Sequence, residues 1–491
     1  MISRKFKIPG LNEKKNMDHL VSAIRYLTPK EMNALLKKIK NQKTKLHLLE
    51  LISKEPKIEN KKLVELLSYG ENYSGLYTLK NRLFDDIIAI KLDIQKNVFF
   101  TTREKIPHLR ALVFSKDKIT LIRELNKYEK NTLNLELYGE LKEIYFCFFL
   151  TYKHDDHKKK KYLDLIKKNE EKEILSYQLE QVFYSKLLDT QDLFYFFHTD
   201  EYNKALKALK KIEHIHNEIK DKSSTFLYLS SLLTIYFNKK EDIKQLPDAE
   251  DMLNTLSDLY SHSFLTYKYP NCHIAIQCLY NKYYFLNGEE SKFRETLEHI
   301  KKWLYDVKGY QMFDDSIFYF LYVSILDYIN NKNIEAIPHL IDESVNEEEL
   351  EFKSEKMKCY YLYLLALKNF YTKNYKKSIQ FIMESRNYFN KLDALSSWIE
   401  IENILLAILI YIKQKEFELV ESEIYFLKRK MKKLDYSDAF IKKFKDFIKV
   451  VRDYEKKPAA DKVIKFFEAL QEELAIMRLL SFPEIRKEWE L

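Results

Sequence analysis

The chain has 491 residues, too many for one ordinary compact core, and it carries a formal net charge of +9. It contains only 6 Gly and 9 Pro, far below the average usage of roughly 7% and 5%. Because sheets and loop-rich enzymes need these residues at turns and at positive φ, the composition favours helices joined by short turns. The same shortage disfavours a phosphate-binding loop, and the sequence contains no P-loop, dinucleotide fingerprint, nucleophile elbow or His-Glu-x-x-His helix.

Cysteine use and hydropathy bear on the compartment. The four cysteines are too few and too scattered for a disulfide framework, which favours a reducing environment. The basic N-terminus is not followed by an apolar core, so no signal peptide is predicted. The longest apolar runs, 359–367 and 404–412, have nine residues each, against the roughly 20 that a membrane span requires. We therefore expect a soluble, cytoplasmic protein.

Residues 1–100 are predicted to form a basic helical domain. Residues 1–63 hold 16 Lys and Arg against 6 Asp and Glu, a local net charge of +10. Thr28 to Glu31 read as a helix start, with Thr as N-cap, Pro at the first helical position and Glu completing a capping box. Helices are expected from there to about residue 40, over 44–53, and from a cap at Asn60 to an end at Gly70.

A long helix is expected next, through Leu79, Leu83, Ile87 and Ile90. This succession of helices and short turns resembles a helix-turn-helix DNA-binding unit, which implies a last helix in the major groove and basic residues on phosphates. The alternative is a capping bundle whose lysines are a solvated face. The candidate contacts to nucleic acid or to an acidic partner are Lys61, Lys62, Lys80, Arg82 and Lys91.

From about residue 140 one sequence pattern recurs: an aromatic-rich apolar helix, a polar turn, and a second amphipathic helix. The turns begin 45, 40, 49, 43, 42 and 41 residues apart, a period of about 42. Each hairpin leaves one apolar face that its own pair cannot cover, so stacking of neighbours into a superhelix is expected. The turns begin at Lys153, His198, Asn238, Asn287, Asn330, Thr372 and Lys413.

The hairpins resemble tetratricopeptide repeats. Leu365-Ala366 match the large and small pair of the first helix, Tyr375 matches the turn tyrosine, and Ser378 and Ser385 match the small positions of the second helix. Tyr202 and Ala205 match the Tyr-x-x-Ala element in another copy. The turn glycine is mostly replaced, the closing proline is missing, and the period exceeds 34 residues. The resemblance implies an all-α, degenerate tetratricopeptide-like α-solenoid over residues 105–455.

Aromatic runs such as Tyr360 to Tyr363 are interpreted as interhelical packing, with a peptide-binding groove as the alternative. After a break at Lys456-Lys457-Pro458, residues 459–480 have the apolar spacing of an amphipathic helix, which Ser481-Phe482-Pro483 is expected to end. Residues 459–491 are therefore predicted to be a capping helix and tail, with docking to a partner as the alternative.

Three clusters carry ligand-type side chains, and none predicts a metal site. His154 to His157 lie beside four lysines, which would repel a divalent cation. His214 and His216 are two residues apart and point to different sides of a helix. Cys272-His273 and Cys278 fit no common zinc spacing and read as buried small hydrophobes. No catalytic residue, cofactor or metal is predicted.

The leading hypothesis is a non-catalytic scaffold or adaptor that binds a protein or peptide partner on the solenoid surface. The alternative is a transcriptional regulator with a helix-turn-helix-like N-terminal unit on nucleic acid and a solenoid sensor, an arrangement that the tetratricopeptide resemblance supports. An enzyme with an unrecognised site is the third class.

Overall fold

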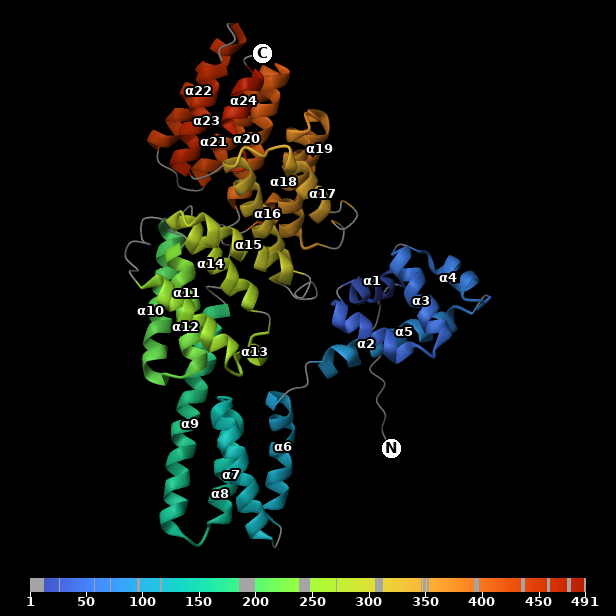
Figure 1. Ribbon diagram of the computed structural model, residues 1–491, viewed down its shortest axis with the longest axis vertical. Coiled ribbons are helices and arrows are strands. Elements are labelled where there is room, and N and C mark those ends of the chain that lie inside the picture. The colour runs from blue at the N-terminus through green and yellow to red at the C-terminus, as the bar shows by residue number, and fades with distance from the viewer. Residues whose placement is uncertain are drawn as a thin grey trace.

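A computed structural model describes most of the chain (Figure 1). The described residues are 13–25, 27–56, 58–70, 72–94, 98–114, 117–184, 199–237, 248–270, 272–304, 312–345, 347, 350, 353–392, 397–433, 438–456, 460–474 and 478–489. Within these ranges there are 24 α-helices and no strand, so the expectation of an all-α protein is confirmed. No helix in the described part combines the length and the apolar character needed to cross a membrane.

The first five helices share a hydrophobic core of their own, centred on Leu35, Leu63 and Leu83. Thr28 accepts a hydrogen bond from the Glu31 N–H at 3.3 Å, and its own N–H donates to Glu31 Oε2 at 2.8 Å, so the predicted capping box is present. The expected cap at Asn60 was wrong, because its side-chain amide donates to the Tyr77 hydroxyl instead. These helices are α1 (Glu13–Arg25), α2 (Pro29–Ile39), α3 (Lys43–Lys54), α4 (Asn60–Leu66) and α5 (Tyr73–Ile94).

A second core forms where the next four helices run side by side, and Leu125, Ile144 and Phe148 lie at its centre. Stacked rings close it at one end, where Tyr162 lies 4.7 Å from Phe148 and 5.9 Å from Tyr152 between ring centroids. The four helices are α6 (Val98–Leu112), α7 (Lys118–Asn134), α8 (Tyr138–Thr151) and α9 (Asp156–Val182).

The third and largest core extends from α9 to the last helix. Its first helices are α10 (Thr199–Ile219), α11 (Lys222–Phe237), α12 (Ala249–Ser261), α13 (Leu265–Lys268), α14 (His273–Asn287), α15 (Glu290–Trp303), α16 (Met312–Asn330) and α17 (Ala336–Ser344). They continue as α18 (Glu355–Tyr371), α19 (Tyr375–Ser385), the 3₁₀ helix η5 (Arg386–Lys391), α20 (Ser397–Gln414), α21 (Phe417–Lys433), α22 (Asp438–Lys456), α23 (Ala460–Leu474) and α24 (Phe482–Trp489).

Five of the seven predicted turns separate consecutive helices: α8 from α9, α14 from α15, α16 from α17, α18 from α19 and α20 from α21. His198 and residues 238–241 lie outside the described residues, and the remainder of the second turn, Thr199 to Glu201, begins α10. Four of the five turns hold a residue in the left-handed region, namely Gly288, Lys332, Lys373 and Lys415. In each, the following N–H donates back to a carbonyl five residues earlier, as in Asn374 to Asn369 at 2.8 Å. This is the Schellman way of satisfying helix-end carbonyls.

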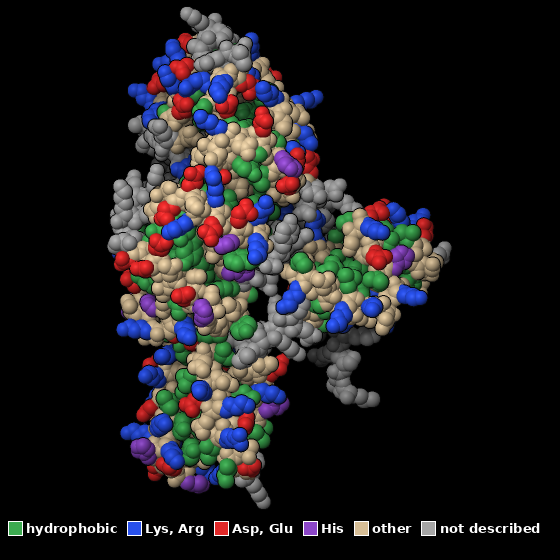
Figure 2. All heavy atoms as spheres, in the orientation of Figure 1, with side chains coloured by type: hydrophobic (Ala, Val, Ile, Leu, Met, Phe, Trp, Pro, Cys, Tyr) green, Lys and Arg blue, Asp and Glu red, His purple; other side chains and the backbone are tan. Residues whose placement is uncertain are grey.

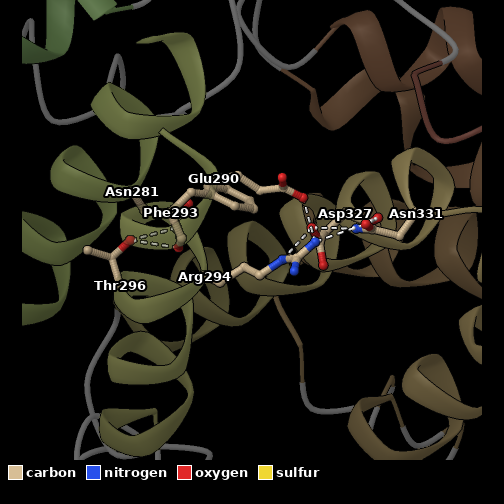
Figure 3. Close-up of polar contacts among 7 residues, drawn as sticks. All are labelled: Asn281, Glu290, Phe293, Arg294, Thr296, Asp327 and Asn331. Carbon is tan, nitrogen blue, oxygen red and sulfur yellow. Dashed lines mark hydrogen bonds and ion pairs between the residues drawn. The ribbon is translucent and has the colours of Figure 1, made fainter. Parts of the chain in front are cut away.

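Polar side chains tie together the two helices of one hairpin and link that hairpin to the next (Figure 3). The Asn281 amide on α14 donates to the Phe293 carbonyl at 2.8 Å and to Thr296 Oγ1 at 2.9 Å, which ties α14 to α15. Arg294 on α15 reaches the end of α16, where it donates to Asn331 Oδ1 at 2.9 Å and lies 3.4 Å from Asp327 Oδ1. The first pair is buried, so it fixes a helix spacing more firmly than the exposed second pair does.

The last helix packs back on the hairpins before it. The expectation that Ser481-Phe482-Pro483 ends a helix was wrong, since α23 already stops at Leu474 and α24 starts at Phe482. Pro483 lies in the first turn of α24, where a missing N–H costs nothing. Tyr371 on α18 donates its hydroxyl to the Leu479 carbonyl at 2.6 Å and accepts from the Ser481 N–H at 3.2 Å.

Candidate functional site

A pocket of about 530 Å³ opens where the second core meets the third. Its wall is made by α6, the start of α8, the second half of α9 and the end of α13. Because these helices come from separate stretches of the chain, the pocket exists only once both cores have formed.

Glu136 ties the floor of the pocket to α11. The residue lies in the left-handed region, with φ of 53°, in the turn between α7 and α8. Its carboxylate accepts hydrogen bonds from the N–H groups of Lys222 at 2.7 Å and Ser223 at 3.0 Å, which satisfies two free donors of that helix end. Burial first, and then the neighbouring carboxylate of Asp221, raise the pKa of Glu136.

Tyr138 and Lys268 add a second layer of polar contacts. The Tyr138 hydroxyl donates to Asp221 Oδ2 at 2.5 Å, and burial raises the pKa of this phenol. Lys268 Nζ lies 2.8 Å from Glu180 Oε1 and donates to Ser223 Oγ at 3.2 Å. These contacts join α8, α9, α11 and α13 into one polar junction, so the pocket wall is held rigidly.

Acidic side chains outnumber basic ones in the pocket wall. Arg103 Nε pairs with Glu140 Oε1 at 2.6 Å, and Lys142 Nζ, beside the wall, pairs with Glu173 Oε2 at 3.0 Å. The wall itself holds five carboxylates against two cationic groups. They are Glu136, Glu140, Glu143, Glu173 and Glu180, with Arg103 and Lys268. Glu143 in turn lies 3.2 Å from Arg110 Nη1, so with Lys142 and Arg110 counted the excess is one negative charge, which favours a lysine or arginine side chain or an organic cation.

The five basic residues singled out in the sequence lie on α4 and α5. Lys61 and Arg82 are exposed, and Lys62 pairs with Glu55 at 2.7 Å. Lys80 is only 4% exposed, its ammonium donates to Asn60 Oδ1, and burial lowers its pKa to about 8. Lys91 lies beside α2, where its Nζ is 3.9 Å from Glu31 Oε2. It is separated from Lys80 by about 16 Å along α5, because the helix rises about 1.5 Å per residue. Lys80 contacts Asn60 at the start of α4, the helix that also carries Lys61 and Lys62, whereas Lys91 lies apart from them.

Asp86 is a residue of this region whose role the sequence did not reveal. Its carboxylate contacts Lys45 Nζ and lies 3.2 Å from Lys38 Nζ. Partial burial acts to raise the pKa of Asp86, but the hydrogen bonds and charges of the two lysines outweigh it and lower that pKa. Part of the basic charge of the first five helices is therefore neutralised internally.

None of the side chains in the three clusters of ligand-type residues lines the pocket. His214 is 3.3 Å from Glu218, and His216 stacks on Tyr228 at 5.1 Å between centroids. His273 meets the Trp303 ring edge-on at 4.8 Å, and burial raises the pKa of Cys272 to about 12. In the part of the chain that the structure covers, no three His, Cys, Asp or Glu side chains converge as metal ligands.

Comparison with known proteins adds no family: no protein-family model, no curated protein and no solved structure matches this chain.

Proposed function

We propose that the protein is a non-catalytic scaffold or adaptor for protein–protein interaction, built on a tetratricopeptide-like α-solenoid. The observation that carries this proposal is the recurrence of one turn geometry. The left-handed residues Gly288, Lys332, Lys373 and Lys415 follow one another at 44, 41 and 42 residues, and each closes the first helix of a hairpin. A repeated supersecondary unit that stacks on its neighbours is the principle of a solenoid.

Packing between hairpins supports the same proposal. Among the first helices of the hairpins, α14 contacts α16, α16 contacts α18, and α18 contacts α20. Each of these four helices also contacts the second helix of its own hairpin. The tetratricopeptide-type small positions lie at these contacts, since Ala366 and Ser378 are both fully buried. Such arrays serve as extended binding surfaces because every hairpin adds exposed side chains in the same orientation.

The acidic pocket is the part of this scaffold that best fits a partner, and its charge points to a basic segment of a protein. Affinity capture with the full-length chain after nuclease treatment tests this, with wild type compared with a Glu140→Lys/Glu173→Lys variant. The matched control, Glu298→Lys/Glu384→Lys, reverses two exposed carboxylates on α15 and α19. Wild type and control should retain a stoichiometric protein that the pocket variant loses. Retention by all three would reject the pocket, and retention by none would reject the scaffold.

A nucleic-acid-binding regulator is the second candidate, and a specific observation favours it. The first five helices have a separate core, and a short turn over residues 40–42 joins α2 to α3. Replacing Lys61, Lys62 and Arg82 by Glu should weaken binding to a DNA duplex. The slope of the logarithm of the binding constant against the logarithm of salt concentration should also become less steep by about three. Reversing Lys207, Lys210 and Lys211 on α10 is the control. Equal binding by both variants, or none by wild type at low salt, would reject the regulator.

A further inference from the structure

The free end of the α6–α9 bundle combines two turns. The α6–α7 and α8–α9 connections lie together at the end of the molecule farthest from α24 (Figure 1). Val113, at the end of α6, and Tyr152, at the end of α8, pack on the same hydrophobic core. We refer to Leu112 to Phe114, Asp117 to Ile119 and Tyr152 to Lys161 as the bundle tip.

Two large hydrophobic side chains of the bundle tip project into solvent. Phe114 is 83% exposed and Ile119 is 85% exposed, the two highest values among the large hydrophobic residues described. Leu112 is 40% exposed beside them. Val113, between Leu112 and Phe114, packs against the second core, whereas Phe114 projects into solvent. Single exposed hydrophobic residues are ordinary, but such a pair flanking one turn is typical of a contact surface.

Lysines dominate the charge of the bundle tip. The bundle tip holds six lysines against three aspartates, and two histidines besides; Figure 2 shows basic, histidine and hydrophobic side chains next to one another at this end. The lysines are Lys118, Lys153, Lys158, Lys159, Lys160 and Lys161. Asp117 and Asp155 are helix caps that accept from the N–H groups of Thr120 and Lys158, both at 3.0 Å. The backbone thus uses both carboxylates, and Asp155 Oδ2 also lies 3.5 Å from Lys158 Nζ.

The ammonium groups of three of these lysines, Lys158, Lys159 and Lys161, lie over aromatic rings of the bundle. Lys158 Nζ is 4.3 Å from the centroid of the Tyr152 ring, and Lys161 Nζ is 5.3 Å from that of Tyr162. Four consecutive lysines in the first two turns of α9 oppose the helix dipole, which favours acidic residues there. The helix dipole therefore does not account for these lysines, whereas an external anionic surface would.

We propose that the bundle tip binds the surface of an anionic lipid bilayer. Phe114 and Ile119 enter the boundary between headgroups and acyl chains, and the lysines contact the phosphates and carboxylates of the headgroups. The aliphatic Ile119 distinguishes this from nucleic acid, because it offers no π face on which a base could stack. The binding is peripheral and uses surface side chains only.

Flotation of the full-length protein with vesicles tests this directly. Vesicles of phosphatidylcholine with about 30% phosphatidylserine should bind the chain, and pure phosphatidylcholine should not. Binding should fall steeply between about 0.1 M and about 1 M salt, where the screening length drops roughly threefold. Failure to bind the anionic vesicles at low salt would overturn the proposal.

Two variants assign the contact to the bundle tip. Replacing all four lysines from Lys158 to Lys161 by Gln should lower the partition coefficient onto the anionic vesicles by two orders of magnitude or more, since each lysine contributes about fivefold. Phe114→Ser/Ile119→Ser should lower it on the order of tenfold. The control Ile174→Ser/Tyr425→Ser alters two exposed positions away from the bundle tip, on α9 and α21, and should leave binding unchanged.

The reagents also separate other partners. All variants change surface side chains, so thermal unfolding like that of wild type is required before binding is compared. Vesicle binding that survives both bundle-tip variants would overturn the proposal. The proposal would also be overturned if the bundle-tip variants lost a captured protein or single-stranded RNA but still bound vesicles.

Discussion

Ser378 on α19 donates its hydroxyl to the carbonyl oxygen of Ala366 on α18 at 2.7 Å, and both residues are fully buried. The contact joins the two helices of one hairpin where only small side chains fit. Ser378→Ala should lower the free energy of unfolding by about 1 kcal/mol, through the lost hydrogen bond. Ser378→Leu should lower it by at least about 1–3 kcal/mol, because the larger side chain would force the helices apart. Urea denaturation of both variants checks the order, and a neutral Leu variant would contradict it.

The left-handed turns give a prediction of opposite sign at two equivalent positions. Lys415 has φ of 61° and is exposed, so Lys415→Gly should stabilise the protein by about 0.5–1 kcal/mol. Gly288 has φ of 73° and open space around its Cα, so Gly288→Ala should cost about 1 kcal/mol through backbone strain alone. The control Lys210→Gly, inside α10, should destabilise the protein. Thermal unfolding that shifts in the same direction for Lys415→Gly and the control would refute the prediction.

Lys282 should make stability depend on pH. Burial, with the nearby charge of Arg478, lowers the pKa of Lys282 from 10.5 to about 7. Between these values the unfolded chain holds a proton that the folded chain has released, so the free energy of unfolding rises with pH. From pH 7 to pH 9 the gain should be about 2 kcal/mol.

Lys282→Met should remove that gain and be more stable than wild type at pH 7 by an amount that shrinks as pH rises. The measurement is urea denaturation of both proteins at several pH values, with their difference isolating this lysine. Parallel curves for the two proteins across this range would contradict the prediction. Lys301→Met, at an exposed position on α15, serves as the control and should leave the pH dependence as in wild type.

The return of α24 predicts a strong effect of its first residue. Phe482 is 2% exposed and packs near Phe467 at 6.3 Å between centroids. Phe482→Ala should destabilise this end of the protein by about 3–5 kcal/mol. Hydrogen exchange of α20 should accelerate while α2 and α3 stay protected as in wild type. Unchanged exchange in α20 would show that α24 contributes little to covering it.

Local signals predicted local structure well. The Thr28 capping box depends on residues three apart, and the turns near 288, 332, 373 and 415 are marked by polar residues between apolar helices. The burial of Lys80 was also readable, since it falls on the stripe of Leu76 and Leu83 at helical spacing. Because lysines are usually exposed, Lys80 is interpreted from the sequence as a surface contact despite its place on this stripe.

The long-range features could not be predicted in the same way. The contact between Tyr371 and Ser481 joins residues 110 apart, and no pattern near either residue indicates the other. The acidic pocket has the same origin, since Glu136, Glu180 and Lys268 meet only through packing of separate helices. A single sequence records apolar spacing and turns, but not which polar side chains will face each other.

Helix α9 contributes to two cores, and this gives the molecule a mechanical connection. Its first half packs Tyr162 into the second core, and its second half packs Leu179 and Val182 into the third, over a length of about 40 Å. Glu173 and Glu180 of the pocket wall project from the same continuous rod. A lateral force on the outer end of α9 would therefore tilt these carboxylates directly, without any loop to absorb the displacement.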